Sequence, residues 1–126
     1  MKALFTSVLI GASLGGVAHA QSPSTTEISY PQGSIGYEAL MQGDNDRAIL
    51  QILANERVSQ NDPAKRINLG QAYARTGRTK EAAALFKAAI QSREDLDLVL
   101  ADGRVMSSKE AARQALARLQ TRVAAR

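Results

Sequence analysis

The sequence predicts a mainly α-helical protein, built from two antiparallel helix pairs, a small β-hairpin and a capping helix at the C-terminus. A skeleton of apolar and small residues recurs after 34 residues, and a period in this range is typical of stacked helix pairs. Residues 96–106 alternate apolar and polar side chains around an Asp-Gly pair, which indicates a hairpin. Residues 107–124 begin with a capping signal and continue with apolar positions at helical spacing.

The chain divides into five segments by composition and pattern: 1–20, 21–33, 34–92, 93–106 and 107–126. Residues 1–20 combine a positive start, an apolar run and the small-x-small site Ala18-His19-Ala20, which together predict a secretory signal peptide. The alternative, a membrane-anchoring helix, requires about 20 apolar residues, more than this run provides. We therefore expect transfer across the inner membrane, a periplasmic location and a mature chain that begins at Gln21.

Residues 21–33 contain two prolines, several Ser and Thr residues and little periodic hydrophobicity, which predicts a flexible leader. The mature chain has no Cys, and the only His, His19, leaves with the signal peptide. Disulfides, thiol nucleophiles and the usual zinc ligands are therefore excluded, and we expect no cofactor, no metal and no catalytic residue. The remaining enzymatic alternative would use the carboxylates Glu94, Asp95 and Asp97, but acidic residues clustered on a turn are usually only solvated.

Four helices are predicted in the segment 34–92, and their ranges are 35–42, 45–58, 63–76 and 80–92. Ser34, Asp62 and Thr79 are the expected N-caps, because their side-chain oxygens can accept hydrogen bonds from the first free amides. The turns between the helices are short, so sequential helices should be antiparallel neighbours.

The residues that recur after 34 positions predict how these helices pack against one another. The matched positions, 34 residues apart, are Ile35-Gly36 with Leu69-Gly70, Gly43 with Gly77, Ala48 with Ala82, and Ile52 with Phe86. Helix backbones approach closely where side chains are absent or are methyl groups, and the larger residues then fill the space toward the next helix. One pair leaves an apolar face exposed, so pairs must stack.

After the helix pairs we expect strands at about 96–101 and 104–106, whose leucines cover the end of the stack; a loop with one apolar plug is the alternative. Ser107 and Glu110 form a capping box that starts the last helix. This helix carries an apolar stripe at Ala112, Ala115, Leu116, Leu119 and Val123. Another face of this helix is basic and carries Arg118, Arg122 and Arg126, which are spaced by four residues.

At the matched positions of the two helix pairs, the chain resembles the tetratricopeptide repeat (TPR) family over about 34–92. The second copy keeps the family pattern at Leu69-Gly70, Tyr73, Gly77, Ala82, Phe86 and Ala89. It departs from the pattern at Arg66, where an aromatic residue is usual, and at Glu94, where proline is usual. The first copy has Ala39 where Tyr is usual and Asn55 where Ala is usual.

The resemblance implies a concave surface, lined by the first helix of each pair, that holds a peptide or a protein segment. Mapped by position, that surface carries Tyr37, Met41, Asn68, Gln71 and Arg75. The resemblance also implies that two repeats need a further layer, which the hairpin and last helix or a second copy of the chain would supply.

The charge is unevenly distributed, which bears on the kind of partner. Residues 21–62 carry two basic and six acidic side chains, whereas residues 63–126 carry thirteen basic and six acidic ones. We expect a protein-interaction adaptor; the alternative is an envelope protein whose basic last helix contacts an anionic membrane surface or polymer. Export, few aromatic residues and a modest net charge argue against nucleic acid as a partner.

Overall fold

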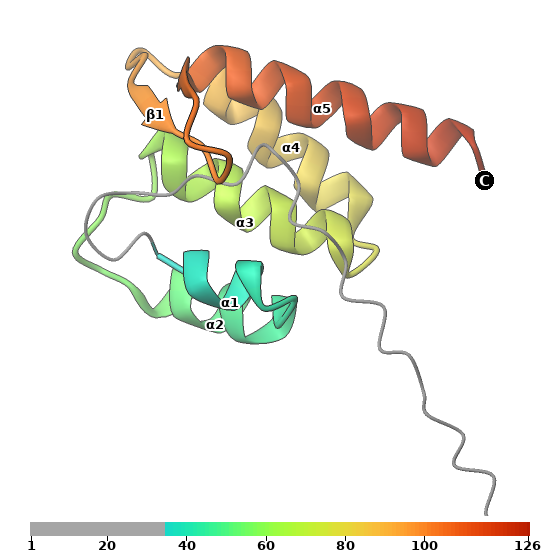
Figure 1. The fold of residues 1–126 in the computed structure, drawn as a ribbon, viewed down its shortest axis with the longest axis horizontal. Helices are drawn as coiled ribbons and strands as arrows, with labels where there is room; N and C mark the ends of the chain where they lie inside the picture. Colours follow the sequence, from blue (N-terminus) through green and yellow to red (C-terminus); the bar gives the residue numbers. More distant parts are fainter. Residues whose placement is uncertain (1–34) are drawn as a thin grey trace, which may run out of the picture.

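The computed structural model describes residues 35–126, which form five helices and one two-stranded antiparallel sheet (Figure 1). The elements are α1 (Tyr37–Met41), α2 (Asn45–Ala54), α3 (Pro63–Arg75), α4 (Thr79–Ile90), β1 (Asp97–Val99), β2 (Val105–Ser107) and α5 (Ser108–Ala124). The predicted mainly helical class with a small hairpin is confirmed. The signal peptide at 1–20, the leader at 21–33 and the cap at Ser34 lie outside the described residues.

Helix α3 is the centre of the fold. It contacts α2 on one side and α4 and α5 on the other, and most of its side chains are buried around the whole circumference. Helices α1 and α2 lie at one end of the stack and α5 lies at the other (Figure 1). A helix buried on all sides must make close contacts with several neighbours at once, and its small residues allow this.

The closest of these contacts joins α3 to α4 at Gly70. A Cβ atom at Gly70 would lie 2.5 Å from Cε1 of Phe86, whose ring is fully buried. The matched residues of the first pair make the same contact, because a Cβ atom at Gly36 would lie 2.8 Å from Cγ1 of Ile52. Both large side chains therefore occupy space that exists only because a glycine faces them.

The turns that follow α1 and α3 are also alike. Gly43 and Gly77 adopt left-handed φ angles of 74° and 82°. The next amide in each turn donates back to a carbonyl of the preceding helix, from Asp44 to Ala39 O at 2.9 Å and from Arg78 to Tyr73 O at 2.8 Å. Glycine adopts this conformation at little cost, so both helices end at the same kind of turn.

Three predicted helix limits are wrong, each for a local reason. Helix α1 begins at Tyr37 because Gly36 stands at its N-cap with a φ of 75°. Helix α2 ends at Ala54 because the Asn55 side chain accepts from the amides of residues 57 and 58, which competes with further helix. Thr79 is not the cap of α4 but its first residue, because the turn at Gly77 brings the helix start one position forward.

The cationic side chains of Lys65 and Arg66 hold the loop between α2 and α3 in place through hydrogen bonds. Lys65 is 3% exposed, and its ammonium group donates to the carbonyls of Asn55 at 2.7 Å and Val58 at 3.1 Å. The Asp62 side chain caps α3 as predicted, accepting from the amide of Lys65 at 2.9 Å. Arg66 reaches Ala88 O near the end of α4, so α3 and α4 run antiparallel.

The hairpin is confirmed, with Leu98 paired to Met106. Its first strand is shorter than predicted, and its second has the predicted length but begins one residue later. Leu98 and Leu100 are each 1% exposed and belong to the same core as the buried alanines of α5, so the hairpin does cover one end of the helical core. The predicted apolar stripe of α5 holds except at its end. Val123 is 49% exposed, on the last turn of a helix that is five residues longer than α4.

The junction between the hairpin and α5 is held by a capping network. The Ser107 hydroxyl accepts from the amide of Glu110 at 3.2 Å, which is one half of the predicted capping box. The Glu110 carboxylate accepts from Arg113 and Gln114 instead of reaching back to the cap. The buried Ser108 hydroxyl accepts from the amide of Leu96 and donates to the carboxylate of Asp95. That carboxylate also accepts from the amide of Lys109 at 3.2 Å. Two acceptors therefore satisfy the first amides of α5.

The hydrogen bond from the Lys109 amide, helped by the two serine hydroxyls, holds the pKa of Asp95 below its usual value. Because the folded pKa lies below the unfolded value of about 3.9, the charged carboxylate stabilises the fold above that pH. This contribution is lost as the pH falls through the folded pKa.

We therefore expect the melting temperature of Asp95→Asn to be lower than that of the wild type at pH 7, with the difference narrowing toward about pH 3. Thermal melts followed by circular dichroism at several pH values measure it. Asp97→Asn, on an exposed position of β1, is the matched control. A gap that stays constant with pH would contradict this account of Asp95.

Candidate functional site

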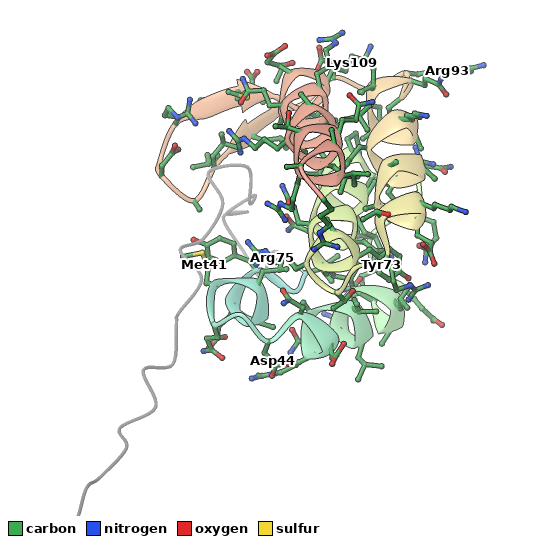
Figure 2. All side chains as sticks on the ribbon, turned by 90° about the vertical axis from the view of Figure 1, so that its right-hand side faces the viewer. Met41, Asp44, Tyr73, Arg75, Arg93 and Lys109 are labelled. Carbon is green, nitrogen blue, oxygen red and sulfur yellow. The ribbon has the colours of Figure 1, made fainter. Side chains whose placement is uncertain are left out.

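The candidate site lies on α3 and on the two helices, α1 and α5, that each contact α3; we call it the α1/α3/α5 face. Tyr37 and Met41 on α1 are half-buried, and Arg75 lies at the end of α3. A guanidinium nitrogen of Arg75, Nη1, donates to Leu40 O at 2.9 Å. Figure 2 shows Met41 and Arg75 toward one side of the molecule and Tyr73 toward the other. Three of the five predicted residues are therefore close together and partly accessible.

The other two predicted residues, Asn68 and Gln71, lie deeper. They are 2% and 7% exposed, so they present little surface to solvent. Both make polar interactions, as buried amide side chains must if they are not to lose the free energy of their hydration. In the described fold their first role is to satisfy polar groups within a mostly apolar helix.

Helix α5 adds two basic residues that sequence analysis did not connect with this site. Arg118 and Arg122 line a small hollow together with Gln71 of α3. The lining is completed by Ala74 of α3, Phe86 of α4, and Ala115 and Leu119 of α5. The sequence signal was the spacing of arginines by four along the last helix, but no local pattern says that this helix packs against α3.

The electrostatics of the face are dominated by positive charge. Burial lowers the pKa of Arg75, and the positive charge of Arg122 lowers it further. Like charges placed near one another in a partly desolvated site repel, and an anion placed between them relieves that repulsion. The face is therefore suited to carboxylates or other anionic groups.

The carboxylates considered for catalysis serve other purposes or are exposed. Asp95 accepts hydrogen bonds at the start of α5, and Glu94 and Asp97 are on the surface. Within residues 35–126, no three His, Cys, Asp or Glu side chains gather in a way that could hold a metal ion. In the same range, no helix has the length and apolar character needed to cross a bilayer.

Comparison of the chain with protein-family models, with curated proteins and with solved structures finds no match.

Replacing Arg75 should loosen α1, because the hydrogen bond to Leu40 O is a direct polar link between α1 and α3. We expect Arg75→Ala to lower the free energy of unfolding by about 1.5–3 kcal/mol, the range for a hydrogen bond with a charged donor. Amide hydrogen exchange in α1 should accelerate more than exchange in α4. Arg93→Ala, an exposed residue after α4, is the control. Equal exchange in α1 for both variants would show that Arg75 does not hold this helix.

Proposed function

We propose that this chain is an exported adaptor whose TPR-like helix pairs bind a peptide or protein segment on the α1/α3/α5 face. The export part rests on the signal sequence at 1–20, and N-terminal sequencing of the secreted protein tests it, with Gln21 expected as the first residue.

The repetition of one local arrangement at a 34-residue offset carries the proposal. Gly36 faces Ile52 as Gly70 faces Phe86. The turn after α1 also repeats in the turn after α3, with the same left-handed glycine and the same backward hydrogen bond. Repeats of this kind arrange their first helices side by side along one surface, and such extended surfaces are what repeat proteins use for binding.

The face has the composition of a binding surface more than of a reaction site. Tyr37 and Met41 offer accessible apolar area, and the aromatic and methionine side chains are both common in recognition surfaces. Arg75 and Arg122 add positive charge beside them. A segment with apolar side chains and at least one carboxylate would therefore match this face.

The alternative, an envelope protein whose last helix contacts an anionic surface, receives less support. The apolar stripe of α5 would have to reach that surface, but its members Ala112, Ala115 and Leu119 are buried in the core. All three arginines, Arg118, Arg122 and Arg126, are exposed, and the first two line the hollow next to Gln71 of α3.

Site-specific photocrosslinking in the producing cell tests the adaptor function. A photoreactive residue at Tyr37 or Met41 should yield a reproducible crosslinked partner, because both side chains reach the surface of the proposed face. The same photoreactive residue at Arg93, which is exposed after α4, is the matched control. Mass spectrometry then identifies the partner.

The expected crosslink should also weaken several-fold when Arg122→Glu is combined with the probe at Met41, because the charge of the face is reversed at one position. Crosslinks of equal yield from Arg93 and Met41 would refute the assignment of the face, and so would a lack of any partner from Tyr37 and Met41.

A further inference from the structure

The two ends of the helical stack carry apolar side chains that nothing in the described fold covers. At one end, Leu50 and Leu53 of α2 are 69% and 48% exposed. They lie on the side of α2 opposite the buried Ala48 and Ile52, so no packing role within the first helix pair accounts for them. Exposed leucines that neighbour each other on a helix surface favour contact with another molecule.

At the other end, α4 and α5 border an open cleft of about 340 Å³. The cleft is lined by Thr79, Lys80 and Ala83 of α4 and by Leu119, Gln120, Val123 and Ala124 of α5. Val123, the residue that departs from the predicted buried stripe, lies in this cleft. The helices of the molecule pack against one another in a stack that reaches as far as α5. A further helix placed in the cleft would contact both α4 and α5 and so extend this stack.

The charges of the two ends are complementary. Residues 35–62, which include α1 and α2, carry five acidic and two basic side chains. The two helices that border the cleft, α4 and α5, carry six basic side chains and two acidic ones, Glu81 and Glu110. Opposite charges around two apolar patches steer the patches together and fix their orientation.

We propose that a second copy of this chain docks its α2 side chains Leu50 and Leu53 into the α4/α5 cleft, so that copies associate head to tail. The two contacting surfaces are different, and they lie at opposite ends of the molecule (Figure 1). The contact is therefore heterologous, and each dimer retains one free α2 surface and one free cleft. Association should grow with protein concentration into a series of species and should weaken as salt screens the charges.

Sedimentation velocity of the purified protein tests the contact, over about 10–200 μM protein and at about 50 and 500 mM salt. One variant removes the α2 surface, with Leu50→Gln and Leu53→Gln. The other removes the cleft, with Lys80→Glu and Val123→Glu. Each variant alone should remain a monomer, because every possible contact lacks one of its two surfaces. We expect association to weaken at least a hundredfold in each case.

Mixing the two variants gives the sharpest result, since one intact α2 surface and one intact cleft remain. The mixture should form a 1:1 complex and stop there, which also shows that both variants are folded. Val105→Gln, which changes a side chain 66% exposed on the hairpin, should associate as the wild type does. A wild type that stays monomeric, variants that do not pair on mixing, or an equal effect of Val105→Gln would each overturn the proposal.

Discussion

The close approach of the Phe86 ring to the backbone of α3 is the constraint on which the rest of the structure depends. A single methyl group at Gly70 would lie 2.5 Å from the ring, closer than nonbonded carbon atoms come. This contact sets how near α4 can lie to α3, and so where α5 lies against both. The first helices satisfy the same constraint with Gly36 and Ile52. The same close contact with a glycine therefore occurs in both helix pairs. The hairpin leucines and α5 cover the end of the helical stack that would otherwise be open.

This packing also determines what the candidate site can be. Because α3 is enclosed by α2, α4 and α5, its polar residues Asn68 and Gln71 become part of the interior, and only its end reaches the accessible face. Arg75 is at that end, where it holds α1 through Leu40 O and lies near the positive charge of Arg122. The proposed recognition of a partner segment and the proposed association of copies would therefore use separate surfaces. The first uses the α1/α3/α5 face, and the second uses the two ends of the stack.

Much of the fold could be predicted from the sequence because its signals are local. Asp62 before Pro63, Ser107 before the last helix and the Asp-Gly turn of the hairpin each act over a few residues. The prediction that Gly36 is helical is wrong, because its match with Gly70 concerns packing, whereas Gly36 stands at the N-cap of α1 with a left-handed φ angle. The burial of Gln71 and the position of Arg122 beside α3 depend on how α5 packs, which is a long-range contact without a local signature. Val123 is exposed because it lines the open cleft beside the first turns of α4, which is also a long-range arrangement.

A double-mutant cycle at Gly70 and Phe86 tests the central claim most directly, with the free energy of unfolding in urea as the measured quantity. Gly70→Ala should destabilise the wild type by about 1–3 kcal/mol through overpacking, even though alanine favours a helix over glycine by about 1 kcal/mol. In the background of Phe86→Leu, where the ring atoms are gone, the same change should be neutral or stabilising. A Gly70→Ala that stabilises both backgrounds equally would contradict the claim that the ring packs against this glycine.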